Sequence, residues 1–227
     1  QGKFVDITDE SGLAGGPRDW STGAAWFDYD NDGLLDLFVC NYVLWDRDLD
    51  LSLGFSLTGV GRAFGQPTAF TGTNSRLYHN DGGSFSDVSK AAGIDVYNPT
   101  SKEQIPIGKG LAVATIDIDQ DGWLDIVVAN DTVQNFLFRN VDGERFEEEA
   151  VSYGIAFDRG GVATGAMGID CCFLRNDQSL AVAIGNFANE PSSLYVLKDP
   201  TDLFFDEALA TGIGPESRRY LTFGMLF

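Results

Sequence analysis

Basic residues, cysteine and histidine are scarce in this chain, and each scarcity excludes a class of function. Lys and Arg total 15 against 34 Asp and Glu, which gives a net charge of −19. Binding to nucleic acid through phosphate contacts requires the opposite balance, so we expect no nucleic-acid partner. The three cysteines, Cys40, Cys171 and Cys172, neither define a disulfide framework nor have zinc-ligand spacing.

Long apolar runs are also absent. No stretch approaches the roughly 20 apolar residues of a membrane span, so direct membrane insertion is not expected. No signal peptide is visible, and because the chain opens with Gln1, we interpret the sequence as a mature or trimmed form. Hydrophobic residues make up 44% of the chain and aromatic residues 12%, which predicts a packed core rather than a disordered chain.

The most informative stretch reads DYDNDGLLD, with a glycine at Gly33 where the loop must bend. Its spacing and hard oxygen ligands match the first positions of an EF-hand loop, yet Val39 stands where the twelfth-position Glu would be. Short apolar runs, AAWF and LFVCNY, flank it and indicate strands rather than helices. We therefore predict a calcium loop between two strands, with the ligands Asp28, Asp30, Asp32, the backbone carbonyl of Leu34, and Asp36.

The same pattern recurs as DIDQDGWLD, again between apolar runs. The predicted ligands of this second Ca²⁺ site are Asp117, Asp119, Asp121, the backbone carbonyl of Trp123, and Asp125. An acidic turn in a hairpin is the plain alternative, because Asp-Gly is a common hairpin signal. Two copies with matching aspartates favour metal binding. The pattern indicates a metal and carries no sign of catalysis.

Two further motifs accompany the loops and indicate a repeat. In each of four tails, eight positions separate a Phe from a Gly: Phe4 to Gly12, Phe85 to Gly93, Phe146 to Gly154, and Phe204 to Gly212. Between loop and tail lie LYHNDGG, LFRNVDG and LYVLKDP, each typical of a strand that ends in a turn. The unit thus has four short antiparallel strands, as a propeller blade does.

The predicted fold is an all-β propeller of four-stranded antiparallel blades, and its units can be bounded. They are 1–13, the outer strand of a closing blade; 21–94, a blade with an insertion at 43–74; 108–155; 163–213; and 220–227, the start of the next blade. In the insertion, Asp46, Asp48 and Asp50 alternate, and we interpret them as a solvated acidic loop rather than a metal site. The third unit keeps only a weak remnant of the loop (Asp170, Asn176 and Asp177), and Ala181 replaces its last Asp, so no calcium is expected there.

FDYDNDGLLDLFVCN and IDIDQDGWLDIVVAND resemble the FG-GAP/VCBS repeats of integrin-α-like propellers, closest to the bacterial relatives of cartilage acidic protein. The resemblance spans essentially the whole chain. It implies a seven-bladed ring with Ca²⁺ between the first two strands of a blade. It also implies an extracellular, periplasmic or cell-surface location and a role in adhesion or assembly with protein partners.

An enzyme is the less favoured interpretation. Asp131, Glu103 and Glu190, which lie outside the loops, form no recognisable pair of the kind that glycosidases use. The single histidine, His79, ends a strand and is interpreted as structural, and no GxSxG nucleophile motif occurs. A lectin-like module that binds glycans is the main alternative to a protein scaffold. Its candidate sugar-stacking residues are Trp20, Trp45 and Phe64.

Overall fold

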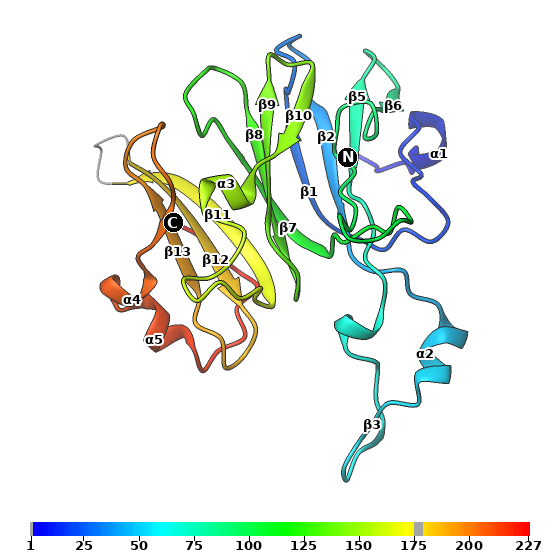
Figure 1. Cartoon of the computed structure of the whole chain (residues 1–227). Helices are drawn as coiled ribbons and strands as arrows, with labels where there is room; N and C mark the ends of the chain where they lie inside the picture. Colours follow the sequence, from blue (N-terminus) through cyan, green and yellow to red (C-terminus); the bar gives the residue numbers. More distant parts are fainter. Residues whose placement is uncertain (1, 175–178) are drawn as a thin grey trace.

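The computed structural model describes residues 2–174 and 179–227 and consists mainly of antiparallel β-sheets (Figure 1). Three sheets have four strands each, and in each sheet neighbours in sequence are neighbours in space. The first sheet contains β1 (Ser21–Phe27), β2 (Asp36–Asn41), β5 (Arg76–Asn80) and β6 (Phe85–Asp87). The second contains β7 (Gly110–Ile116), β8 (Asp125–Asn130), β9 (Phe136–Val141) and β10 (Arg145–Glu148). The third contains β11 (Ala166–Leu174), β12 (Ser179–Asn186), β13 (Ser193–Leu197) and β14 (Phe205–Asp206). The predicted all-β class is confirmed.

The remaining elements are short. A small hairpin, β3 (Ser56–Leu57) with β4 (Gly61–Arg62), lies in the 43–74 insertion together with α2 (Arg47–Leu53) and a 3₁₀ turn, Pro67–Ala69. The other helices are single turns: α1 (Thr8–Ser11) precedes the first sheet, α3 (Ala150–Tyr153) follows the second, and α4 (Ala208–Thr211) and α5 (Ile213–Ser217) follow the third. In the described part of the chain, no helix has the length and apolar character of a membrane-crossing segment.

The second sheet is packed on both faces, and strand β8 explains how. Successive side chains of a strand point to opposite faces. Accordingly Ile126 and Val128 pack in one core with Phe38 of the first sheet, while Val127 and Ala129 pack in another with residues of the third sheet. All six residues of β8 are buried. A run of consecutive apolar residues, such as 126–129 in β8, is therefore typical of a strand in a sheet that is covered on both faces.

The Phe–Gly tails form a contact that repeats from one sheet to the next. Gly93, at the end of the first sheet's tail, adopts a left-handed φ of 83°, and a Cβ there would lie 2.5 Å from the carbonyl oxygen of Phe146 in the next sheet. Only glycine combines this φ with so close an approach. Gly12 meets Phe85 and Gly154 meets Phe204 in the same way, at 2.5 and 3.0 Å. Each tail thus joins its own unit to the following one.

Two terminal segments differ from the sequence prediction. Residues 2–7 and 220–227 form no strand in the described chain, so neither pairs into a ladder with another strand. The second segment nevertheless runs beside the third sheet. The Thr222 N–H donates to the Asn186 carbonyl at 3.2 Å, and the Phe227 N–H donates to the Asp170 carboxylate at 2.7 Å.

Candidate metal centre

The first predicted loop joins β1 to β2 and brings its carboxylates together. One oxygen each from Asp28, Asp30 and Asp36 lies within 4.8 Å of the others. Asp32 belongs to a neighbouring group with Asp30 and His79, also within 4.8 Å. All four predicted carboxylates therefore converge on one end of the first sheet. This spacing suits a single cation bridged by oxygen ligands.

Backbone hydrogen bonds explain why the loop curls in this way. The Asp28 carboxylate accepts from the N–H groups of Asp32 at 3.1 Å and Gly33 at 2.9 Å, and Asp32 accepts from the Leu34 N–H at 2.7 Å. Gly33 has φ of 89°, a conformation that costs other residues energy. The predicted bend at Gly33 is confirmed.

The second loop, between β7 and β8, repeats this geometry. Asp117 accepts from the N–H groups of Asp121 at 3.1 Å and Gly122 at 3.0 Å, and Asp121 accepts from the Trp123 N–H at 2.9 Å. Oxygens of Asp117, Asp119 and Asp125 lie within 4.8 Å of one another, while Asp121 is outside this group. The ring of Trp123 packs on Gly143 in the β9–β10 turn, so this side chain anchors the loop.

The last aspartate of each loop is buried and accepts two backbone hydrogen bonds. The Asp36 carboxylate accepts from the Tyr29 N–H at 3.1 Å and the Asn80 N–H at 2.8 Å. The Asp125 carboxylate accepts from the Ile118 N–H at 2.8 Å and from the N–H of Asn140 in β9 at 2.7 Å. These residues thus fasten each loop to the third strand of its sheet, besides facing the other carboxylates.

Burial makes these carboxylates unstable as anions unless a cation joins them. Burial raises the pKa of Asp125 to about 7, against the effect of its two backbone hydrogen bonds, and the charges of Asp119 and Asp121 raise it further. Burial also raises the pKa values of Asp36 and Asp119. Within the described residues, no ion pair reaches the second loop's grouped aspartates. A divalent cation with oxygen preference fits this site.

Two asparagines at the ends of β5 and β9 complete the loops and were missed from the sequence. The Asn80 side-chain amide donates to the Leu35 carbonyl at 2.9 Å. The buried Asn140 amide donates to the carbonyls of Leu124 at 3.2 Å and Tyr29 at 2.8 Å, so it spans both loops. The shared Asn in LYHN and LFRN was the available signal.

The two loops also touch directly, because the Asn31 side chain donates to the Gly122 carbonyl at 3.3 Å. The loops are therefore neighbours on one rim, and each helps to position the other.

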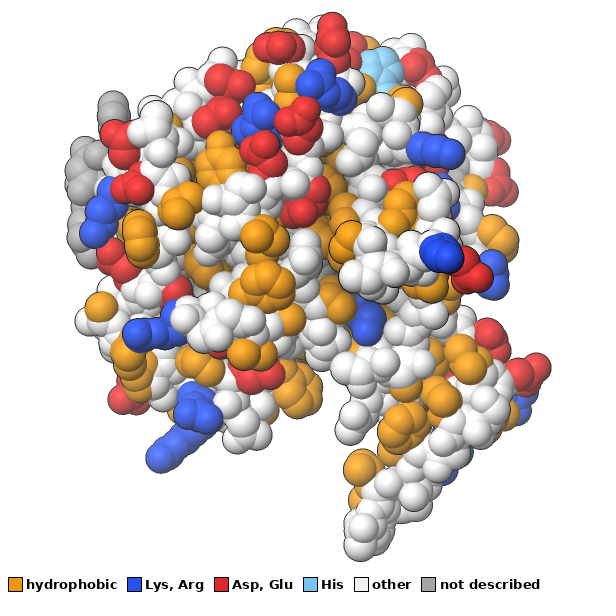
Figure 2. Space-filling model, in the orientation of Figure 1, with side chains coloured by type: hydrophobic (Ala, Val, Ile, Leu, Met, Phe, Trp, Pro, Cys, Tyr) orange, Lys and Arg blue, Asp and Glu red, His pale blue; other side chains and the backbone are white. Residues whose placement is uncertain are grey.

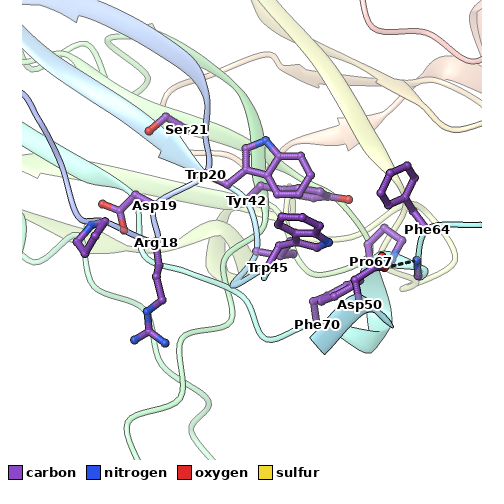
Figure 3. A pocket seen from close by; sticks show the side chains of 13 residues that line it. Arg18, Asp19, Trp20, Ser21, Tyr42, Trp45, Asp50, Phe64, Pro67 and Phe70 are labelled. Atoms are coloured by element: carbon purple, nitrogen blue, oxygen red, sulfur yellow. Dashed lines mark hydrogen bonds between the residues drawn. The ribbon is translucent and has the colours of Figure 1, made fainter. Parts of the chain in front are cut away.

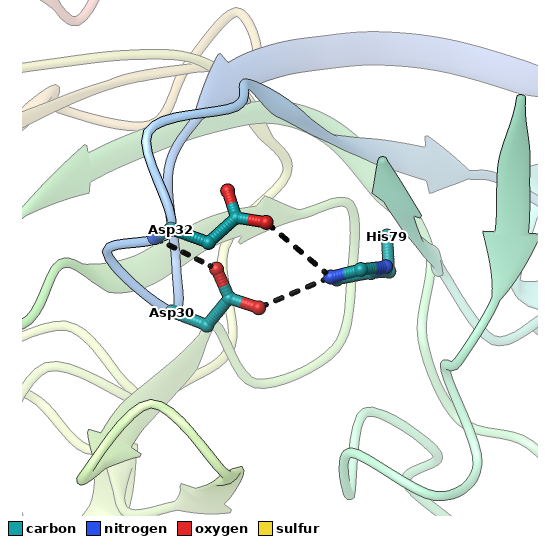
Figure 4. A group of neighbouring side chains, drawn as sticks. All are labelled: Asp30, Asp32 and His79. Carbon is teal, nitrogen blue, oxygen red and sulfur yellow. Dashed lines mark hydrogen bonds and ion pairs between the residues drawn. The ribbon is translucent and has the colours of Figure 1, made fainter. Parts of the chain in front are cut away.

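The first loop has a histidine within ion-pair distance of its aspartates. His79 Nε2 lies 3.1 Å from an oxygen of Asp30 and 4.0 Å from one of Asp32, as Figure 4 shows, while Nδ1 is 2.9 Å from Asp81. The hydrogen bond with Asp81 and the charges of Asp30 and Asp36 raise the pKa of His79. At the equivalent place in β9, Arg139 pairs instead with Glu147 and Glu149.

In the third hairpin, β11 and β12 stay paired as far as Leu174 and Ser179, and the described residues at the loop positions differ from those of the first two hairpins. Phe27 pairs with Asp36 in the first sheet, and Cys172 pairs with Ala181 in the third, so Phe173 corresponds to Asp28. Asp170 is therefore not the counterpart of the first ligand: it lies inside β11, opposite Ala183. The other two remnant residues, Asn176 and Asp177, are outside the described residues.

The structure also places the acidic residues outside the loops. Asp131 and Glu190, expected to form no pair, line one cavity of about 500 Å³, whereas Glu103 lies on an exposed loop. Each of the two has a partner that holds it: the Tyr42 hydroxyl donates to Asp131 at 2.5 Å, and the Gly165 N–H donates to Glu190 at 2.7 Å. Both connect loops at the rim opposite the metal loops.

Comparison with known proteins gives no relative, since neither a family model nor a curated protein matches the chain. The resemblance to FG-GAP/VCBS repeats therefore stays a prediction, and the functional argument depends on the geometry described above.

Proposed function

We propose that the chain is part of a calcium-stabilised β-propeller of the FG-GAP/VCBS type. On this proposal it acts outside the cytoplasm as a non-catalytic scaffold for adhesion, assembly or binding of protein partners. One observation carries the calcium proposal: two successive sheets gather three aspartates each within 4.8 Å, at the same turn between their first and second strands. A chance acidic turn would not repeat with the same backbone hydrogen bonds.

The propeller arrangement is supported by the order of the sheets and their contacts. Strand β7 of the second sheet contacts both β1 and β11, the first strands of its two neighbours. First strands that pack side by side, with the later strands farther out, are the arrangement of propeller blades around an axis. The repeated Gly-to-Phe tail contact supports it further, because the same step relates each unit to the next.

The chain's own residues give the loops a structural role. Asp36 and Asp125 tie each loop to the third strand, and Asn31 and Asn140 tie the loops to each other. Bound Ca²⁺ would supply the positive charge that lets the clustered carboxylates stay ionised. Because no residue of the loops lies on a helix that could move, we infer that the calcium sites are structural rather than those of a calcium sensor.

The proposed location follows from the affinity expected of such sites. Calcium modules outside the cell have dissociation constants of about 10⁻⁴–10⁻³ M, which match the millimolar calcium found there. Short, exposed loops of this kind fit that range better than the tight cytosolic range.

Calcium titration by calorimetry tests this proposal. We expect two Ca²⁺ per chain, one lost in Asp30→Asn and the other in Asp119→Asn. Asp48→Asn, an exposed aspartate on α2 outside both loops, is the matched control and should keep both. Absence of binding at millimolar Ca²⁺, or equal loss in the control, would contradict the proposal.

A further inference from the structure

The 43–74 insertion forms an arm that stands away from the first sheet. Figure 1 shows it leaving the sheet at the end opposite the metal loops, and Figure 2 shows hydrophobic side chains gathered along it beside a hollow. The solvated acidic loop expected here is wrong for Asp50, which is 1% exposed. Its carboxylate pairs with Arg62 and accepts from the Gly65 N–H at 3.0 Å. This pair, in which only Asp50 is buried, joins α2 to the hairpin and helps to fix the shape of the arm.

A cavity of about 920 Å³ opens between the arm and the first sheet. We call it the aromatic cleft. Its volume lies within the range of roughly 300–1,000 Å³ found for ligand sites. Five aromatic side chains line it, two from the sheet end and three from the arm: Trp20, Tyr42, Trp45, Phe64 and Phe70. The three candidate stacking residues of the sequence thus meet at one site.

The two rings of the sheet end and Trp45, at the base of the arm, form a continuous wall. Trp20 lies edge-on to Tyr42, with ring centroids 5.6 Å apart, and edge-on to Trp45 at 6.1 Å. In Figure 3 these rings stand together, with Phe64, Pro67 and Phe70 across from them. Mutual packing holds the rings without a ligand, so the wall is preformed. Preformed aromatic surface binds with a low entropy cost.

Polar groups at the cleft are arranged for a ligand with both donors and acceptors. In the described chain, the indole N–H groups of Trp20 and Trp45 and the Arg18 guanidinium make no hydrogen bond to protein. One oxygen of Asp19 holds Arg76 and the Gly16 N–H, which leaves its other oxygen available as an acceptor. An apolar wall bordered by free donors and an acceptor suits a sugar ring, which has a C–H face and hydroxyl edges.

The charges at the cleft further limit the class of ligand. The two carboxylates that line the cleft already pair with arginines, Asp19 with Arg76 and Asp50 with Arg62. A cationic ligand therefore has no unpaired carboxylate to bind. The net charge of −19 disfavours an acidic polysaccharide. With cationic ligands and acidic polysaccharides disfavoured, an uncharged oligosaccharide is the class of ligand that fits the cleft.

We propose that the aromatic cleft between the first sheet and its inserted arm is a binding site for an uncharged oligosaccharide. The site needs no calcium, because the metal loops lie at the other end of the β1–β2 hairpin, where Phe27 pairs with Asp36. The proposal is therefore independent of the calcium sites. Substitution of a ligand aspartate in either metal loop should leave oligosaccharide binding unchanged, provided that the protein stays folded.

The test uses an array of neutral and acidic oligosaccharides, followed by titration of the best-bound one. We expect neutral glycans to bind, and Trp45→Ala to weaken binding at least about tenfold, the usual effect of removing a central aromatic anchor. Trp26→Ala is the control, since Trp26 is an exposed tryptophan that packs on Phe85 away from the cleft, and this variant should bind normally.

A folding defect in Trp45→Ala is separated from loss of the site by Trp45→Phe, which keeps an aromatic face and should recover most of the affinity. Three results would overturn the proposal. They are no glycan bound on the array, undiminished binding by Trp45→Ala, and binding to a proline-rich peptide array in place of glycans, since aromatic grooves also bind such peptides.

Discussion

Removal of calcium should lower the melting temperature of this protein by a calculable amount. At about 10 mM free Ca²⁺ and dissociation constants of about 10⁻⁴–10⁻³ M, each site stabilises the fold by about 1.4–2.7 kcal/mol. Two independent sites then contribute about 3–5 kcal/mol in total. For a chain of this size each kcal/mol corresponds to about 2–4 °C, so EDTA should lower the melting temperature by roughly 6–20 °C.

The structure gives a physical reason for the loss. Without a cation, the buried Asp125 carboxylate faces Asp117 and Asp119 and is only weakly acidic, with a pKa of about 7. Its two backbone hydrogen bonds then compensate only part of its desolvation. Differential scanning calorimetry with and without EDTA measures the effect. Asp119→Asn should remove about half of the calcium-dependent shift, whereas Asp48→Asn should leave it unchanged. A melting temperature that does not respond to calcium would refute the reasoning.

Two further predictions concern the contacts between units, and chemical denaturation measures both. Gly93→Ala and Gly212→Ala both place a Cβ at a left-handed φ, 83° and 82°, but only at Gly93 does the Cβ meet a neighbouring carbonyl. Gly93→Ala should therefore lower the free energy of unfolding by at least about 1 kcal/mol more than Gly212→Ala. Equal losses would argue against the tail contact. Asn140→Ala should lower the free energy of unfolding by about 2–4 kcal/mol, because the buried Asn140 amide spans both loops. Asn80→Ala should lower it less, because Asn80 lies nearer the solvent. The reverse order would contradict the assigned role of Asn140.

The curl of the two acidic loops could be predicted from the sequence because its information is local. The spacing of the aspartates and the glycine fixes the curl, and backbone N–H groups within the same loop complete it. The strand after the second loop was equally visible, since β8 contains the apolar run 126–129, of the kind that buried strands require. Local pattern and final structure agree at these places.

The errors arose where a residue's role depends on a distant partner. Asp50 looks solvated in sequence, and its burial depends on Arg62 across the arm. Asp170 looks like a first ligand, but the strand register places Phe173 at the position of Asp28 and leaves Asp170 inside β11. The cavity that Asp131 and Glu190 line together, which the sequence could neither predict nor exclude, likewise depends on residues far apart in the chain. Tertiary register cannot be read from spacing alone.

The two ends of the β1–β2 hairpin divide the proposed work of the protein. One end is closed by charged residues, where Asp36 ties the loop to β5 and Asn31 ties it to the second loop. The other end opens into the aromatic cleft, where Tyr42 follows β2 directly and Trp20 precedes β1. The backbone ladder between them fixes where these rings stand, so rigidity at the metal end helps keep the cleft preformed. Loss of calcium should therefore weaken glycan binding only as far as it unfolds the sheet, and glycan binding by the folded, calcium-free protein separates the two roles.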